Sequence, residues 1–420
     1  MGKNFKISVN SEIGALEGVI LHTPGREVEN MTPENAERAL YSDILNLTVA
    51  SKEYSLLPGV LNKISKTFQV KELLEKVLAN EKVKADLINK ICLNENVYDI
   101  KNFLMERESP ELAAMLIEGV IMEKDNLTKF LSKERYSLKP LHNFFFTRDS
   151  SIVISDSIFI GRMKNKVRGR EAIIMETIFD FHPMFNTKTI NPLNNENMNE
   201  SVSIEGGDIL VVRDDILVIG IGARTSPEGI DFIIDKLNES KKKINLIIQE
   251  LPPKPESFIH IDMIFTMLDV DTCMIYEPAI LSPNKYHTVH ICLDNGKVNF
   301  IREEKNILEA LKKLGLDLKP VYCGGDQDPW VQEREQWHSG ANFFALGEGK
   351  VIGYGRNHYT IDALNRNGFE IIKASDVIKS KVNLDDHEKY VVTIKGSELS
   401  RGGGGCRCMT MPISRKPVNW

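Results

Sequence analysis

Two cysteines stand one residue apart near the C-terminus, in the stretch RGGGGCRCMTMP that runs from Arg401 to Pro412. A cysteine thiolate is a strong nucleophile that can form a covalent intermediate with a bound substrate. Four glycines precede Cys406 and Cys408, and a mobile glycine loop could bring one of these thiols into a site built by other segments. The stretch alone is equally compatible with a flexible tail that carries two unreactive thiols.

Carboxylates and a histidine occur at other points of the chain, next to predicted strands. In FIHIDMIF, His260 and Asp262 are two residues apart, so a strand would place both side chains on one face. In SIEGGD, Glu205 and Asp208 flank two glycines, which suggests a bulge or a close backbone approach that turns both carboxylates toward one site. An edge strand or an acidic turn exposed to solvent explains each pair about as well.

Arginines and a further aspartate complete the set of candidate residues. The motif HNFFFTRD places Asn143 and Asp149 around three phenylalanines, which would hold the polar side chains rigidly. Arg168, Arg170 and Arg224 follow the second strands of successive predicted units. Arginine is suited to bidentate binding of a carboxylate. A charge exposed to solvent is the alternative for each of these arginines.

Taken together, these side chains fit one kind of ligand. Two aspartates can clamp a planar guanidinium by paired charge-assisted hydrogen bonds, and a thiolate can then attack its central carbon. Arginines at the rim of the site would hold a carboxylate at the other end of the ligand. A free amino acid that carries a guanidinium group, namely arginine, has this chemistry.

The composition limits the class of protein. With 420 residues, of which 42% are hydrophobic and 27% charged, the chain is predicted to be soluble and globular, with one large core or two ordinary ones. A net charge of -6 and a pI near 5.9 argue against nucleic acid as a partner. No apolar run predicts a signal peptide or a membrane span. Six cysteines without regular spacing predict reduced thiols and a cytoplasmic location.

The elements that must position these residues repeat along the chain. The segment from Asp208 to Leu251 predicts two strands, a helix that begins at Ser226 and Pro227, and a third strand. The same order recurs at intervals of roughly 55 to 80 residues. The termini, through LEGVILHTPG and KYVVTIKG, would supply a fifth unit. We therefore predict an α/β ring of ββαβ units with the site at its centre; an ordinary mixed sheet is the alternative.

Residues 53–139 differ in composition from the rest of the chain. No glycine occurs between Val60 and Glu118, and apolar residues recur at helical spacing. Ser109 and Pro110 are typical of a helix start. We predict an all-helical domain over residues 53–139, inserted into a catalytic domain formed by residues 1–52 and 140–420.

The order of motifs resembles that of the arginine deiminase family, which belongs to the guanidino-group-modifying superfamily and has the fold of a five-bladed pseudo-symmetric α/β propeller. The motifs NFFFTRD, VRGRE, EGGD, GARTS, HIDMIF, EREQW, GKVIGYGRN and RCMTMP occur in the family's order, almost from end to end. The resemblance implies hydrolysis of L-arginine to L-citrulline and ammonia through a covalent amidino-thioether, with no cofactor and no metal. It also implies a homo-oligomer, a dimer or a tetramer.

The resemblance assigns catalytic roles to five residues. Cys408 would be the nucleophile, His260 and Glu205 would transfer protons, and Asp149 and Asp262 would bind the guanidinium group.

It assigns contacts at the outer end of the substrate to a second group. Asn143, Arg168 and Arg224 would hold the α-carboxylate. Asp208 would support the site, and Arg407 matches a residue beside the nucleophile in some members.

The sequence also departs from the family's pattern. His142, Ser150, the pair His338 and Ser339, and Gly403 replace residues that are common in the family, which leaves the fit of the outer end of the substrate open. An amidinotransferase, or a hydrolase acting on another guanidino compound, could use the same cysteine chemistry.

Two further alternatives belong to other classes. One is a binding protein without turnover. The other is a metal site built from His260, Asp262 and Glu205 with His287 or His290, although their spacing matches no strong zinc pattern. Cys406 is unusual in this family, and we expect the loop to turn it away from the site.

Overall fold

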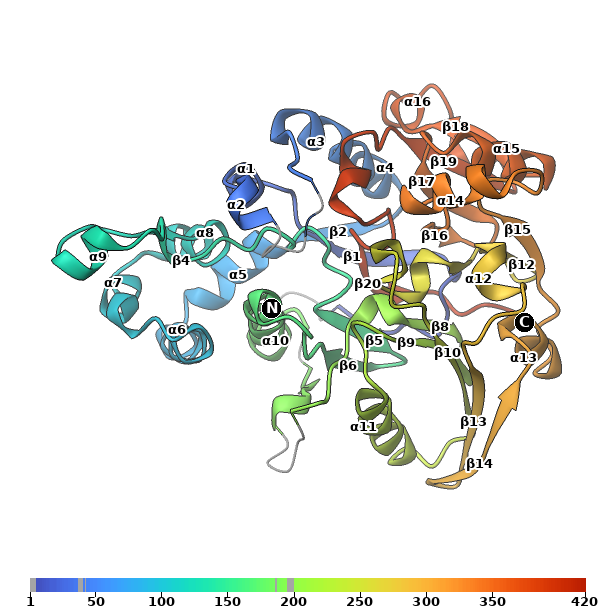
Figure 1. Ribbon diagram of the computed structural model, residues 1–420, viewed down its shortest axis with the longest axis horizontal. Helices are drawn as coiled ribbons and strands as arrows, with labels where there is room; N and C mark the ends of the chain where they lie inside the picture. The colour runs from blue at the N-terminus through green and yellow to red at the C-terminus, as the bar shows by residue number, and fades with distance from the viewer. Residues whose placement is uncertain (1–4, 37–40, 42, 186, 195–199) are drawn as a thin grey trace.

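The computed structural model describes residues 5–36, 41, 43–185, 187–194 and 200–420. Within these residues the strands form six sheets. The strands gather around the middle of the molecule, and helices such as α11, α13 and α16 lie at its periphery (Figure 1). No helix in the described part of the chain combines the length and the apolar character needed to cross a bilayer.

The segment from Asp208 to Leu251 folds as predicted. Its elements are β8 (Ile209–Arg213), β9 (Ile216–Ile221), α11 (Pro227–Asn238) and β10 (Ile244–Glu250). β8 pairs with β9 in antiparallel register, and β10 pairs with β9 in parallel register. The Ser226 side chain caps α11 by accepting a hydrogen bond from the N–H of Gly229, and Pro227 occupies the first turn. The predicted order of strand, strand, helix and strand is confirmed here.

The preceding unit has the same order. It consists of β5 (Ser151–Ile154), β6 (Ser157–Ile160), α10 (Gly169–Phe181) and β7 (Thr189–Ile190). β6 pairs with β5 in antiparallel register and with β7 in parallel register.

The next unit contains an extra hairpin that the sequence did not reveal. The unit consists of β11 (Phe265–Met267), β12 (Thr272–Ile275), α12 (Glu277–Ile280), α13 (Ile307–Lys313) and β15 (Lys319–Tyr322). Between α12 and α13 the chain forms β13 (Thr288–Asp294) and β14 (Lys297–Glu304), and β13 pairs with β10 of the neighbouring unit. That sheet therefore has five strands, in the order β14-β13-β10-β9-β8.

The segment from residue 329 to residue 394 corrects one prediction. Its elements are α14 (Pro329–Trp337), β16 (Phe344–Gly347), β17 (Lys350–Tyr354), α15 (His358–Arg366), β18 (Glu370–Lys373), α16 (Ala374–Ile378) and β19 (Tyr390–Ile394). β19, the strand of KYVVTIKG, lies between β17 and β18 and is parallel to both. It was expected beside the N-terminal strand, and that expectation is wrong because its apolar residues complete this sheet instead.

The two ends of the chain meet in a separate sheet. β1 (Leu16–Leu21) pairs with β20 (Met411–Arg415) in antiparallel register and with β2 (Lys66–Gln69) in parallel register. The connection from β1 to β2 contains α1 (Arg26–Glu29), α2 (Pro33–Ala36), α3 (Leu47–Tyr54) and α4 (Leu56–Ile64). A unit closed across the termini is therefore present, with β20 as the strand that closes it.

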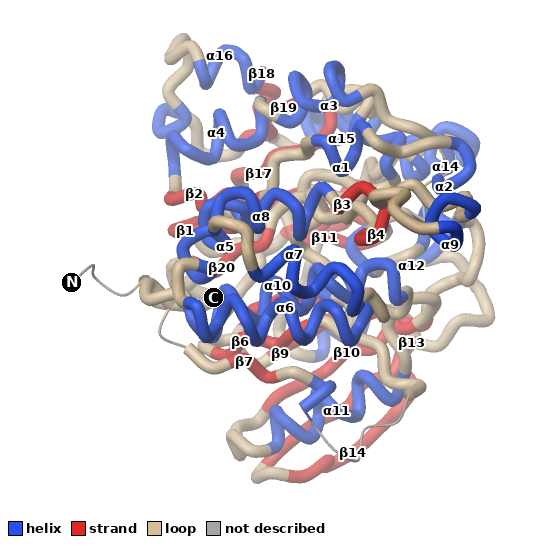
Figure 2. Tube along the Cα trace, turned by 90° about the vertical axis from the view of Figure 1, so that its left-hand side faces the viewer, coloured by secondary structure: helices blue, strands red, loops and turns tan. Residues whose placement is uncertain are grey.

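The segment predicted to be all-helical is helical only in part. It contains α5 (Val70–Leu78), α6 (Glu81–Glu95), α7 (Lys101–Met105), α8 (Ser109–Glu118) and α9 (Leu127–Leu131), together with β3 (Val120–Ile121) and β4 (Tyr136–Leu138). A start at residue 53 is too early, because α4 and β2 pack in the sheet unit of β1. The helices project to one side of the molecule in Figure 1 and face the viewer in Figure 2, and the buried faces of α5, α6, α7 and α8 share one apolar cluster with α10.

Candidate active site

A cavity of about 640 Å³ lies where loops from several sheet units meet. Six residues that the sequence predicted line it, Asn143 among them; the others are Cys408, His260, Asp149, Arg168 and Arg224. In contrast, Asp262, Glu205, Asp208 and Arg407 lie behind this surface, at least 99% buried.

Cys408 is held in a turn just before β20, facing a carboxylate. Its Sγ lies 3.8 Å from Oδ2 of Asp262. The side chain of Asn342 connects the two segments: its Oδ1 accepts hydrogen bonds from the N–H groups of Arg407 (2.9 Å) and Cys408 (3.3 Å), and its Nδ2 donates to the carbonyl of Asp262 (3.1 Å). A Cβ on Gly405 would lie 2.5 Å from that Oδ1, so the close approach requires glycine.

The remaining glycines of the loop shape the turn that carries Cys408. Gly403 has φ +83°, in the left-handed region that favours glycine, and the carbonyl of Gly404 accepts a hydrogen bond of 2.9 Å from the Tyr354 hydroxyl. Cys406 is fully buried in an apolar cluster and does not line the cavity, whereas Cys408 does. The loop thus presents one thiol to the cavity and turns the other away.

Arg407 lies beneath the site and does not reach the cavity. Its Nη1 donates to Oδ2 of Asp262 at 2.8 Å, and its Nε and Nη2 donate to Glu12 at 3.0 and 2.9 Å. Burial alone would lower the pKa of Arg407, but the two carboxylates outweigh this effect and raise it. This position does not support the substrate contact predicted for Arg407; its guanidinium orients Asp262 instead.

His260 lines the same cavity and stands between two carboxylates. Its Nε2 lies 3.0 Å from Oε2 of Glu205, and its Nδ1 lies 3.6 Å from Oδ1 of Asp149. A Cβ on Gly207 would lie 2.5 Å from that Nδ1, which explains one glycine of the EGGD motif. The predicted strand through His260 and Asp262 is wrong: residues Ile261–Met263 form a 3₁₀ turn, and β11 begins only at Phe265.

Asp208 holds this 3₁₀ turn in place through a hydrogen bond to its backbone. Its Oδ1 accepts a hydrogen bond of 3.0 Å from the N–H of Ile261, the residue between His260 and Asp262. Burial raises the pKa of Asp208 to about 7. This contact would serve the supporting role predicted for Asp208, because the peptide group that it holds lies between His260 and Asp262 in the chain.

The charges around the site favour a protonated His260 and a neutral Cys408 thiol when no substrate is bound. Burial alone would lower the pKa of His260, but Asp149, Asp208 and Glu205 raise it to about 9. Burial alone would raise the pKa of Glu205, but its hydrogen bond to His260 and the charge of that ring lower it to about 2. Burial raises the pKa of Cys408 well above its ordinary value, and Asp262 and Asp149 raise it further.

The arginines predicted to hold a carboxylate differ in availability. Arg168 is fully engaged, because its Nη1 lies 2.6 Å from Asp149 and its Nε and Nη2 contact Glu171 at 3.1 and 2.8 Å. Among the described residues, Arg224 makes only a long contact of 3.9 Å with Glu205, and its side chain is 15% exposed. Arg224 is therefore the freer of these two arginines.

Three residues that shape the site were not predicted from the sequence. Glu171 lies three residues after Arg168, and this spacing on a helix could have indicated the pair. Glu12 contacts a residue 395 positions away, and Asn342 contacts residues 65 and 66 positions away. No local pattern marks such distant partners.

The positions of the site residues bear on the alternative of a metal site. Ligand atoms of Asp149, Glu205 and His260 lie within 4.8 Å of one another, so this part of the site could hold a cation. His287 and His290 do not join them, because they contact Glu303 and Asn245 respectively. Since the carboxylates raise the pKa of His260, a metal ion would compete with a proton for its ring.

Comparisons with known proteins agree with the order of motifs. The family model for arginine deiminase matches residues 37–415. Arginine deiminases from Bacillus cereus and Oenococcus oeni are each 32% identical to this chain. The alignments, 432 and 430 positions long, cover 98% of this chain and 99% and 98% of the relatives.

Solved structures show the same mixed α/β fold. An amidinotransferase from Microseira wollei, of the saxitoxin pathway, has a TM-score of 0.55 at 14% identity and covers 98% of each chain. Dimethylarginine dimethylaminohydrolase from Pseudomonas aeruginosa, complexed with citrulline, has a TM-score of 0.51 at 14% identity, covering 95% of this chain and 99% of that one. At such identities the likeness concerns the fold alone. On the strength of the family model and the full-length relatives, the chain belongs to the arginine deiminase family.

Proposed function

We propose that this protein hydrolyses free L-arginine to L-citrulline and ammonia. Membership of the family supports the reaction. The observation that carries the proposal is the arrangement across one cavity, where the Cys408 thiol faces Asp262 and the imidazole of His260 lies between Asp149 and Glu205. These are the groups that covalent deimination of a guanidinium requires.

The first half of the reaction forms the covalent intermediate. Asp149 and Asp262 would accept hydrogen bonds from the guanidinium nitrogens and hold its plane. Once the bound guanidinium has favoured loss of the Cys408 thiol proton to solvent, the thiolate attacks the central carbon, and His260 donates a proton to a terminal nitrogen. The C–N bond then breaks, ammonia leaves, and an amidino-thioether remains on the sulfur.

The second half regenerates the enzyme. His260, now neutral, takes a proton from a water molecule, and the resulting oxygen nucleophile attacks the same carbon. The hydroxyl proton of the adduct passes to solvent as the C–S bond breaks with its electrons on sulfur, which releases citrulline and restores the thiolate. The charged ring of His260 lowers the pKa of Glu205, and the ionised Glu205 in turn stabilises the imidazolium form of His260.

Substrate binding itself would help to activate the nucleophile. In the empty site, burial and two carboxylates keep Cys408 protonated. A bound guanidinium places a positive charge next to Asp149 and Asp262, which offsets their negative charge and lowers the cost of forming the thiolate.

The outer end of the substrate would be held mainly by Arg224. Its guanidinium is partly exposed at the cavity, and Asn143 lines the same space. Arg168 would take part only by giving up one of its contacts with Asp149 or Glu171.

We also infer the larger organisation of the chain. The ββαβ order of the sheet units supports a five-bladed propeller in which residues 70–139 are an insertion and the remainder is the catalytic domain. The free cysteines of the described chain are compatible with the cytoplasm. The family resemblance leads us to expect a homodimer or homotetramer, which light scattering would test.

The decisive experiment measures products from a panel of guanidines. With arginine, citrulline and ammonia should appear in equal amounts, and Cys408→Ser should bind arginine without forming them. Agmatine lacks the carboxylate and should react poorly. Arginine incubated with glycine tests the alternative: ornithine together with an amidinated glycine would identify an amidinotransferase and overturn the proposal.

A further inference from the structure

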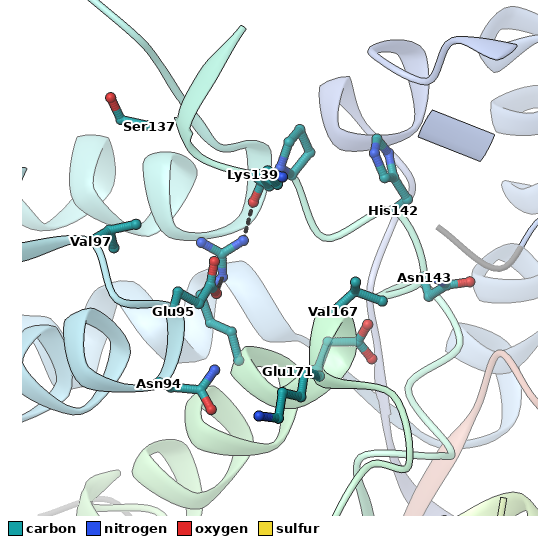
Figure 3. Close-up of a pocket in the computed structure, with 12 residues that line it drawn as sticks. Asn94, Glu95, Val97, Ser137, Lys139, His142, Asn143, Val167 and Glu171 are labelled. Atoms are coloured by element: carbon teal, nitrogen blue, oxygen red, sulfur yellow. Dashed lines mark hydrogen bonds and ion pairs between the residues drawn. The ribbon is translucent and has the colours of Figure 1, made fainter. Parts of the chain in front are cut away.

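A second cavity, of about 260 Å³, lies where the helical insertion meets the catalytic part. Figure 3 shows Asn94 and Glu95 at the end of α6 and Lys139 after β4 on one side, with Val167 and Glu171 near the start of α10 on the other. None of the residues to which we assign a catalytic step lines it. Asn143 lines both cavities, but no step of the proposed reaction takes place in this one.

The wall of this cavity contains a buried arginine with unused hydrogen-bonding capacity. Arg170 is 1% exposed. Its Nη2 donates to the carbonyl of Lys139, and its Nε lies 3.2 Å from Oε1 of Glu95. Its Nη1 has no hydrogen-bond partner among the described residues. A buried donor without a partner is costly, so an acceptor placed in the cavity would stabilise this group.

The charges around the cavity also favour an acceptor. Its charged lining residues are Lys139, Lys166, Arg170, Glu95 and Glu171. Both carboxylates already have an arginine partner, since Glu95 contacts Arg170 and Glu171 contacts Arg168 at 2.8 Å. Lys166 is exposed and forms no ion pair within the described part of the chain. Lys139 contacts Glu134 at 2.9 Å, but both side chains are partly exposed, so this ion pair is weak and leaves Lys139 able to bind a further anion. The unfilled capacity of the lining therefore lies on its cations.

We propose that this cavity, which we name the junction pocket, binds a small oxyanion, a phosphate or a carboxylate, through Arg170, Lys166 and Lys139. Guanidinium and ammonium groups form strong charge-assisted hydrogen bonds with such anions. The pocket adjoins the first turn of α10, a helix of 13 residues, whose dipole also favours negative charge. Its volume leaves room for an organic phosphate or a dicarboxylate as well as for inorganic phosphate.

Binding has a structural consequence that can be measured. Lys139 comes from the insertion side of the pocket, whereas Lys166 and Arg170 come from the catalytic side. An anion held between them joins the two parts and, by mass action, stabilises the folded chain. Phosphate and sulfate also stabilise proteins through exclusion from their surfaces, so a rise in Tm alone is not diagnostic.

The test is isothermal titration with inorganic phosphate, and separately with succinate, against chloride at constant ionic strength. We expect saturable binding of at least one of these probes to the full-length protein; which of the two binds more tightly identifies the ligand as a phosphate or a carboxylate. Lys166→Gln should weaken binding of the probe about two- to fivefold, the range for one exposed ion pair. Arg170→Gln should weaken it at least about tenfold, provided that circular dichroism shows a native fold.

A matched control separates the junction pocket from the active site, which also contains arginines. Arg224→Gln removes a cation from the active-site cavity only and should leave the affinity for the bound probe unchanged. Absence of saturable binding to wild type overturns the proposal. So does binding that weakens in Arg224→Gln and not in Lys166→Gln. If Arg170→Gln does not fold, Lys166→Gln with this control decides the matter.

Discussion

Replacement of Asn342 by alanine should impair catalysis as well as weaken the fold. The side chain makes three hydrogen bonds to the backbone around the nucleophile, two to the Arg407 and Cys408 amides and one to the Asp262 carbonyl. A typical buried hydrogen bond contributes about 1 kcal/mol, so the substitution should cost about 3 kcal/mol of unfolding free energy.

The kinetic effect follows from geometry. Asn342 joins the turn of Cys408 to the turn of Asp262, and these two groups must act on the same guanidinium carbon and nitrogens. Displacement of a reacting group by about 1 Å costs on the order of 100-fold in rate. We therefore expect a fall of about 100-fold in kcat, with a smaller change in KM.

Three measurements check this prediction: citrulline release at saturating arginine, urea unfolding, and the rate of Cys408 alkylation by iodoacetamide. Asn245→Ala is a matched control, because Asn245 is 4% exposed and contacts His290 at 2.9 Å, outside the active site. The control should lose stability and keep its kcat. A folded Asn342→Ala protein with wild-type kcat and alkylation rate would refute the positioning role.

Further predictions concern the arginines, the histidine and the second thiol. Arg224→Gln should raise KM for arginine with little change in kcat, and it should leave KM for agmatine unchanged. Arg168→Gln leaves two buried carboxylates without their partner and should lower the free energy of unfolding in urea by about 3 to 5 kcal/mol. Equal stability in the two variants would contradict this. The raised pKa of His260 contributes stability that is complete below pH 6.5 and is lost as the pH rises through about 9. Urea unfolding from pH 6 to 10 should show this loss in wild type and not in His260→Asn. Cys406→Ala should keep both kcat and the peroxide sensitivity of Cys408; protection from peroxide would instead indicate a disulfide between the two.

Several elements of the fold were predictable because their signals are local. The N-cap at Ser226 and the following proline mark a helix start through contacts within four residues, and β8 and β9 form a hairpin across a short turn. The glycines of EGGD also predicted a close backbone approach, which Gly207 makes against His260.

Other elements could not be predicted because their partners are chosen across the molecule. Strand β19 carries a clear apolar run, but nothing in that run shows that it pairs with β17 and β18 and not with the N-terminal strand. The strand expected at His260 failed for a related reason. Its alternating polar residues are buried in a turn, where Asp208 holds the peptide that follows His260.

The sequence by itself determined the reactive groups, because their identities and the order of their motifs along the chain are enough to indicate cysteine chemistry on a guanidinium. The tertiary structure decided which of these groups are free to act. Arg407 and Arg168 looked like substrate ligands, yet each is bound to buried carboxylates, Glu12 with Asp262 and Glu171 with Asp149. The physical reason is that a buried charge must be paired, and the partners that pair it come from segments with no pattern linking them in sequence.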